Sequence, residues 1–321
     1  MMDRAQSQSV TPVLIASAGN PIPVSLFSMV LGLSGLGYAL LSGSILWGIP
    51  QGVAEAELLL TLVVWGGLIL TYLVQFLRDP NLIAKEFHDP SQGSQAALIG
   101  ISTLALVPGL VRYSFAGACV VAAAGISWHV GFSLWHTSKL WQGTRDINDV
   151  SPALYLPDVA GNFTSAAALG ALDQADLAWL FLGAGVFSWL TLEPVIKSSI
   201  WHRPSLPPSR RSLVGIQAAP AVVCAASVLL VNPQIAGPWV MMLLGYGLFQ
   251  LMQGFRLISW LKMQRFTHSY WTYTFGMTSA LNVCLKLALA GNVAARALSL
   301  PLMIAVTAFI IYLFVRTVRG R

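Results

Sequence analysis

The chain has 321 residues, of which 56% are hydrophobic and 9% are charged, and its mean hydropathy is +0.70. A soluble globular domain carries about 25% charged residues, so this composition excludes an ordinary water-soluble fold. The net charge of +6 does not indicate a nucleic-acid partner, because the basic residues stand in twos and threes between apolar runs and form no dense basic stripe.

Apolar runs of membrane-crossing length recur along the chain. Residues 1–23 precede them and lack the basic region and continuous apolar core of a signal peptide, so we expect a short N-terminal tail. We predict an all-α integral membrane protein with a single domain over residues 24–316 and a C-terminal tail over 317–321. Ten transmembrane helices are expected near residues 24–46, 57–77, 95–111, 115–138, 153–171, 177–197, 212–231, 238–261, 270–290 and 296–316.

The positions of Lys and Arg predict the orientation of these helices. Almost all of the 18 basic residues fall in the two tails or in alternate loops, on one side of the predicted bundle. The exceptions are Arg112 and Arg296, in loops of the other side, and Lys286, inside a predicted span. Basic loops stay in the cytoplasm, so both termini are expected to be cytoplasmic.

Odd-numbered and even-numbered spans differ in composition. Odd spans carry helix-disturbing residues such as Gly35, Pro108, Pro157, Pro220 and Gly276, whereas even spans are richer in plain aliphatic residues and Trp. A proline in a membrane helix is tolerated where the freed carbonyl faces protein or water. The pattern therefore predicts five helical hairpins in a quasi-five-fold arrangement, with the odd helices 1, 3, 5, 7 and 9 lining a central pore.

Several segments resemble the tellurite-resistance/dicarboxylate transporter family, and in particular its bacterial TehA-type members. In chain order they are PVSLFSMVLGLSGLG at 23–37, YLPDVAGNF at 155–163, FLGAGVFSWLTLEP at 181–194, GIQAAPA at 215–221 and YWTYTFG at 270–276. Five motifs in order are more specific than any one of them.

This resemblance implies a ten-helix, quasi-five-fold anion channel in a bacterial inner membrane, homotrimeric and similar to plant guard-cell slow anion channels. In that family a phenylalanine of the ninth helix plugs the pore, and Phe275 is the matching position here. Inner-helix positions are matched by Phe27, Pro157, Gly161, Asn162 and Pro220. Gln217, Thr278, Asn282 and Lys286 are further pore-lining candidates from their place in odd spans.

Phe275 is the strongest site prediction. An isolated phenylalanine in a span is usually a packing residue, and the resemblance favours a gate instead. An aromatic ring in a narrow lumen blocks small anions, because they cannot shed water against it without a large cost.

Three charged residues have two readings each. Lys286 could attract anions from the bundle interior, or its ammonium could reach the nearby outer surface. Asp158 and Glu193 are possible proton-coupling acids. Both acids lie near the cytoplasmic ends of their spans, and Glu193 has Lys197 one turn on, so a structural ion pair or a cap for broken backbone is the other reading.

The sequence offers no cofactor, metal site or enzyme signature. His129 and His136 share a helix face without a third ligand, and Cys119, Cys224 and Cys284 stand alone. The expected function is a gated channel for small anions. The alternative is a proton-coupled transporter of C4-dicarboxylates or of an oxyanion such as sulfite or tellurite.

Overall fold

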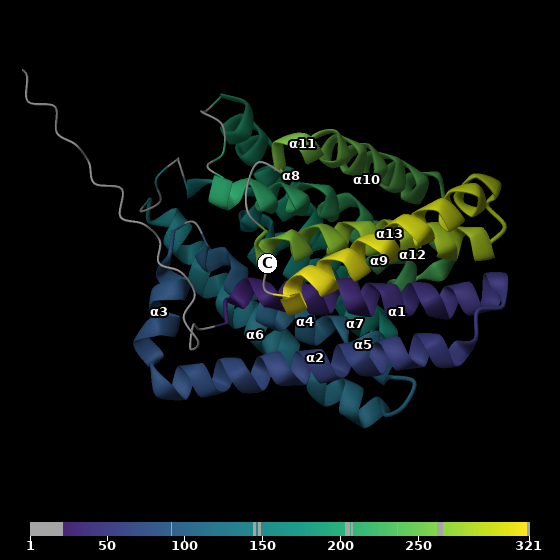
Figure 1. The fold of residues 1–321 in the computed structure, drawn as a ribbon, viewed down its shortest axis with the longest axis horizontal. Helices are drawn as coiled ribbons and strands as arrows, with labels where there is room; N and C mark the ends of the chain where they lie inside the picture. The colour runs from purple at the N-terminus through teal and green to yellow at the C-terminus, as the bar shows by residue number, and fades with distance from the viewer. Residues whose placement is uncertain are drawn as a thin grey trace, which may run out of the picture.

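The described part of the chain consists of α-helices and shorter 3₁₀ or π-helical segments, without a β-strand (Figure 1). The computed structural model describes residues 22–90, 92–143, 146, 149–202, 206, 208–235, 237–261 and 266–319. The all-α prediction is therefore confirmed for these residues. Residues 1–21 and 320–321 of the predicted tails lie outside them, as do Arg4, Arg145, Arg203, Lys262, Arg265 and Arg321.

Five helical stretches, which we call the inner helices, are largely buried. They are η1 (Val24–Phe27) with α1 (Ser28–Trp47); η2 (Gly93–Ala96) with α4 (Ala97–Ala105) and α5 (Val107–Leu110); η4 (Pro152–Leu154) and η5 (Leu156–Ala160) with α7 (Gly161–Ala171); η6 (Pro208–Ala218) with α9 (Ala219–Val231); and η8 (His268–Trp271) with α12 (Thr272–Leu289).

Five longer or more exposed helices, which we call the outer helices, alternate with them along the chain. They are α2 (Gln51–Arg78), α6 (Phe115–Trp141), α8 (Ala175–His202), α10 (Pro238–Arg256) and α13 (Val293–Arg319). The remaining segments are α3 (Pro80–His88), η7 (Pro233–Ile235) and α11 (Ile258–Leu261).

Seven helices of the described residues are long and apolar enough to cross a membrane: 24–47, 51–78, 93–110, 115–141, 175–202, 210–231 and 293–319. Three of them, the inner stretches that begin at residues 24, 93 and 210, are 72–83% buried, and the four outer ones only 11–28%. The expected spans at 153–171, 238–261 and 270–290 correspond to helical segments that do not meet this measure.

The inner helices contact one another in a closed order. Helix α1 packs against α4, α4 against α7, α7 against α9, α9 against α12, and α12 returns to α1. Their 3₁₀ starts also contact one another in a closed order, η1 with η2, η2 with η4, η4 with η6, η6 with η8 and η8 with η1. Each inner helix packs against the outer helix that follows it, as α1 and α2 show in Figure 1.

Close contacts between α1 and α12 depend on glycine. A Cβ at Gly32 would lie 2.3 Å from Thr274 Oγ1, and one at Gly35 would lie 2.2 Å from Thr278 Oγ1. Small residues let membrane helices approach closely, which gives more dispersion contact per unit length. Helix α1 is unbroken over Ser28–Trp47, so these glycines act in packing and do not interrupt the helix.

We expect Gly35→Ala to destabilise the protein by about 1–3 kcal/mol, because the new methyl overlaps Thr278 in a packed interface. Gly67→Ala is the matched control, since a Cβ at this α2 position meets nothing within 4 Å. The melting temperatures of both variants are measured in detergent, by heating the protein and determining the folded fraction by size-exclusion chromatography. Equal melting temperatures for the two variants would contradict the packing role.

The proline of the second inner helix breaks it, as the sequence predicts. Helix α4 ends at Ala105 and α5 begins at Val107, with Pro108 in its first turn. Tyr38 of α1 bridges the break: its hydroxyl donates to Ala105 O (2.6 Å) and accepts from Gly109 N–H (3.1 Å). The side chain thus satisfies backbone groups released by the irregular turn.

A short helix that the sequence analysis did not predict, α3, holds the start of the first inner helix. Asp79 caps α3 by accepting from the backbone N–H of Asn81 and Leu82. Glu86 then accepts hydrogen bonds from Val24 N–H (2.8 Å) and from the Tyr72 hydroxyl (2.7 Å). A carboxylate at a helix N-terminus satisfies free N–H groups and complements the helix dipole.

Candidate functional site

A small apolar cavity lies among all five inner helices. Its space for water-sized spheres is about 20 Å³, roughly enough for one water molecule. Residues from each inner helix line it, including Ser28 and Leu31 of α1, Leu98 of α4, Val159 and Phe163 of η5 and α7, Pro220 and Val223 of α9, and Thr272 and Phe275 of α12. The cavity therefore marks the place where the five helices meet.

Phe275 reaches this cavity from a tightly fixed part of α12. Trp271, four residues earlier, is fully buried and donates from Nε1 to Thr317 Oγ1 of α13 (2.9 Å). On one side of Phe275, Thr274 packs onto Gly32 of α1; on the other, Gly276 lies against the backbone of Ala219. These neighbours hold the α12 backbone in place, so the aromatic ring is presented to the cavity from a rigid support.

Of the predicted pore-lining residues, Pro220 and Phe275 line the cavity. The others lie elsewhere. Phe27 is fully buried, with its ring edge-on to Tyr72 of α2 (centroids 5.8 Å apart). Pro157 lies in the π-helical turn η5 and Thr278 packs onto Gly35.

Gly161 and Asn162 both face the outer helix α6. Gly161 lies beneath the ring of His129, where a Cβ would be 2.1 Å from Nδ1. Asn162 contacts His129 Nε2 through Oδ1 (3.2 Å) and donates from Nδ2 to the Asp158 carbonyl (2.6 Å). Asn282, on α12, donates to the carbonyls of Gly35 and Thr278 (2.8 Å each) and so links α12 to α1.

Most of the residues that line the cavity were not predicted from the sequence. Leu156, Val159, Ala160 and Phe163 have the spacing i, i+3, i+4, i+7, and Ile216, Ala219, Pro220 and Val223 repeat it in another inner helix. Such a spacing places residues on one helix face. The apolar face that the predicted spans share indicates these residues in the sequence. Polar and helix-disturbing residues do not indicate them.

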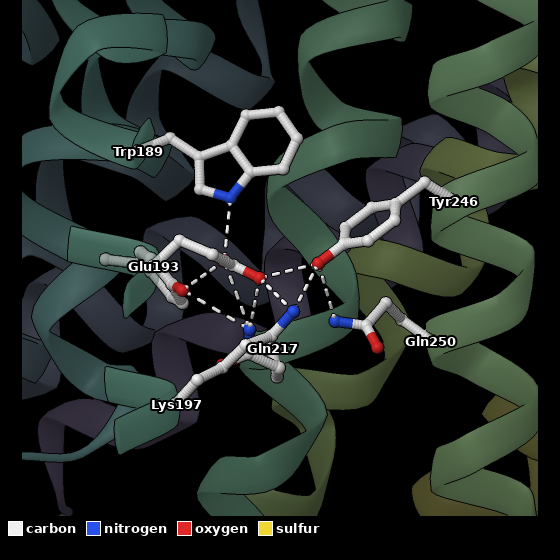
Figure 2. A network of polar contacts seen from close by, with 7 residues as sticks. Trp189, Glu193, Lys197, Gln217, Tyr246 and Gln250 are labelled. Atoms are coloured by element: carbon white, nitrogen blue, oxygen red, sulfur yellow. Dashed lines mark hydrogen bonds and ion pairs between the residues drawn. The ribbon is translucent and has the colours of Figure 1, made fainter. Parts of the chain in front are cut away.

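A polar network surrounds Glu193 of α8 (Figure 2). Its Oε2 accepts hydrogen bonds from the Tyr155 hydroxyl and from Trp189 Nε1 (2.8 Å). Its Oε1 accepts from the Tyr246 hydroxyl (2.6 Å) and forms an ion pair with Lys197 Nζ (2.7 Å). The predicted ion pair with Lys197 is thus present, and it is one part of a larger set of contacts.

Gln217 extends this network to the inner helix η6. Its Nε2 lies 3.2 Å from both carboxylate oxygens of Glu193 and 3.3 Å from the Tyr155 hydroxyl. Tyr246 of α10 accepts from Lys197 Nζ (2.7 Å) and from Gln250 Nε2 (3.2 Å). Since Tyr155 also lines the cavity, the network connects the cavity wall to two outer helices.

Asp158 has a different environment. Its carboxylate accepts hydrogen bonds from the hydroxyls of Ser133 and Thr137 on α6, the latter at 2.7 Å from both oxygens. Among the described residues it has no ion pair with Lys, Arg or His. These hydrogen bonds tie the inner segment η5 to the outer helix α6.

Lys286 lies near the end of α12, in its last turn. Its side chain has neither an ion pair nor a hydrogen bond within the part of the chain that the structure describes. The same residues contain no group of three or more metal-ligating side chains, and the three cysteines are free thiols.

Several long apolar helices, joined in one chain around a buried cavity, define a multi-pass membrane protein. The sequence profile of the voltage-dependent anion channel family (SLAC1) matches residues 21–318, and the chain belongs to this family. It is also similar to the tellurite resistance protein TehA homolog of Haemophilus influenzae, with 33% identity over 263 residues, 82% of this chain and 80% of that protein. The predicted resemblance is confirmed. Membership implies an anion channel or transporter.

Proposed function

We propose that the protein is a gated channel for small anions, with a pore along the axis of the five inner helices that Phe275 closes. The observation that supports it most directly is the position of Phe275 in a cavity lined by all five inner helices and large enough for about one water molecule. In this arrangement each inner helix and its outer neighbour form one of five hairpins, which gives ten transmembrane helices over residues 24–316.

An apolar constriction closes a pore by excluding water. An anion that enters must lose part of its hydration shell, and side chains such as Leu31, Val159, Val223 and Phe275 offer no hydrogen bonds in return. Rotation of one ring would open the passage without moving a helix.

The orientation follows from charge. Described basic residues such as Arg78, Lys139, Lys197, Arg256 and Arg319 fall at the ends of outer helices, and the 3₁₀ starts of the inner helices follow the same loops. We call this the basic end of the molecule. The positive-inside rule assigns it, with both termini, to the cytoplasm of a bacterial inner membrane.

A homotrimer in the lipid bilayer is the proposed assembly, by analogy with bacterial members of the family. Small inorganic or organic anions are the proposed substrates, with neither an enzymatic activity nor a cofactor. Outer helices present large apolar side chains such as Leu134, Leu180, Phe187 and Met242, which suit either lipid or another protomer.

The alternative function, a proton-coupled carrier of C4-dicarboxylates or of sulfite or tellurite, has one supporting observation. Asp158 belongs to the inner segment η5, has hydroxyl partners on α6 and forms no ion pair with Lys or Arg among the described residues. An acid of this kind could bind and release a proton during transport. Glu193 is less suited to this task, because Lys197 and four further donors stabilise its carboxylate.

Flux into liposomes distinguishes the two functions. In liposomes that contain the purified Phe275→Ala variant, we expect a chloride or nitrate gradient to dissipate rapidly. This flux should be electrogenic, and a proton gradient should not change its rate. Repeating the flux measurement with malate and then with sulfite gives the order of anion preference. A flux that saturates, requires a proton gradient and disappears in Asp158→Asn would establish the carrier and overturn the channel.

A further inference from the structure

On α12, two partly exposed positions follow Phe275 along one helix face. Asn282 and Lys286 are partly exposed, whereas every other residue from Thr278 to Ala288 is buried. They lie seven and eleven residues after Phe275, which is close to two and three whole turns of an α-helix. Since Phe275 faces the cavity, this spacing puts Asn282 and Lys286 on the same side of α12, farther from the basic end, and the Asn282 amide also reaches the Gly35 carbonyl of α1 there.

The same pattern recurs on α9 and α7. On α9 the cavity-lining Val223 is followed by the partly exposed Ala226 and Leu230. On α7 the cavity-lining Phe163 is followed by Ala167, which is partly exposed within a buried stretch. Steps of three, four and seven residues keep these positions on the face that lines the cavity.

Helix α4 agrees. Ala105 is seven residues after the cavity-lining Leu98 and is partly exposed after a fully buried stretch. Outer helices cover the other sides of the inner helices. The exposure that α12, α9, α7 and α4 share is therefore best explained by open space along the axis, between the cavity and the end opposite the basic end.

We propose that this space is a water-filled outer vestibule and that Lys286 is its anion-attracting residue. The proposal rests on the channel proposed above and adds the group that concentrates anions at its outer side. Of the vestibule positions just described, Lys286 is the only charged one, and it has no ion pair within the described residues. The described segments of the inner helices carry no acid beyond Asp158, which faces α6 nearer the basic end.

Chemical labelling tests the proposal without any current. In a background with Cys119, Cys224 and Cys284 replaced by serine, we expect Asn282→Cys to react with methanethiosulfonate reagents added from outside. Lys286 lies one turn away, about 6 Å between Cβ atoms. A unit charge at that distance in water changes the local concentration of a monovalent ion about threefold. Lys286→Gln should therefore slow the anionic reagent and speed the cationic one, changing their rate ratio about tenfold.

Two controls make the result specific. Lys286→Arg should retain the wild-type ratio, and Gln51→Cys, at the exposed start of α2, should show rates that do not depend on residue 286. If the ratio of anionic to cationic labelling rates at residue 282 is the same in Lys286→Gln as with the native Lys286, the proposed role of the charge is wrong. Absence of labelling at residue 282 would overturn the vestibule itself.

Conductance gives a second readout. In the Phe275→Ala channel, Lys286→Gln should lower the single-channel chloride conductance about threefold in 0.01 M salt and hardly at all in 1 M salt, where the Debye length falls to about 3 Å. The same loss at both salt concentrations would indicate a structural role at the end of α12 and overturn the proposal. If Phe275→Ala conducts nothing, the proposed channel fails, while the labelling still decides the vestibule.

Discussion

Replacing Phe275 with alanine is expected to raise the anion conductance of the purified protein in planar bilayers at least tenfold. The substitution removes a ring from a cavity that otherwise has room for about one water molecule, and it enlarges the narrowest part of the proposed path. Water can then fill the constriction, and an anion passes without losing its hydration shell. The series Phe275→Leu, Val and Ala should give conductances that rise as the side chain becomes smaller.

Phe249→Ala is the matched control for this series. Phe249 lies on the outer helix α10 and is 53% exposed, so its removal should leave the conductance unchanged. Expression and elution volume must be equal for all variants, so that differences in current report the pore. If Phe275→Ala and the wild type carry equal currents at equal amounts of protein, Phe275 does not close the pore.

Replacing Glu193 with alanine is expected to destabilise the protein by about 2–4 kcal/mol, the largest loss for any single polar side chain discussed above. It leaves Lys197 without its counter-charge and leaves the hydroxyls of Tyr155 and Tyr246, the indole of Trp189 and the amide of Gln217 without an acceptor. Donors left unsatisfied in a partly buried site, together with an unpaired ammonium, cost more than the intact pair contributes.

The variant Lys197→Met separates charge from hydrogen bonding at this site. It keeps the four neutral donors of Glu193, so its thermal stability should fall less than that of Glu193→Ala. The double variant Glu193→Gln with Lys197→Met should lose less than the sum of the two single changes, because no unpaired charge remains. Strict additivity would contradict the coupled network. Anion flux that persists in Glu193→Gln would support a structural rather than a proton-coupling role.

Much of the architecture could be predicted from the sequence, because burial leaves a direct mark on composition. Outer helices such as α2 and α13 carry long runs of aliphatic and aromatic residues, whereas the inner stretch of α4 and α5 combines small residues with Pro108 at a helix break. The short amphipathic helix α3 was not predicted, because its nine residues contain no apolar run of membrane length. Its role depends on Glu86 meeting Val24, 62 residues away in the chain.

The candidate site was harder to predict, because the sequence indicates which face of a helix is polar but not which neighbour that face meets. The ion pair of Glu193 with Lys197 could be read from their spacing of one turn. Gln217 belongs to an inner helix and was expected in the pore, yet it turns to Glu193 on an outer helix. Tyr246 joins the same carboxylate from 53 residues away, and no local pattern signals that contact.

Glycines posed the opposite problem. Gly35 was interpreted as a disturbance of a pore-lining helix, while α1 is continuous and this glycine makes room for Thr278 of α12. A glycine looks the same in the sequence whether it kinks its helix or lets another helix pack closely. Only the partner helix, more than 200 residues later in the chain, decides between a kink and a packing site.

The most direct test of the proposed gate is the current through the variant Phe275→Cys, in a background without the native cysteines, before and after reaction with a bulky methanethiosulfonate reagent. The small thiol should leave the pore open, and its modification should close it again, with recovery on reduction. This result would place residue 275 in the conduction path. A current that stays constant while mass spectrometry shows complete modification would contradict the claim that anions pass Phe275.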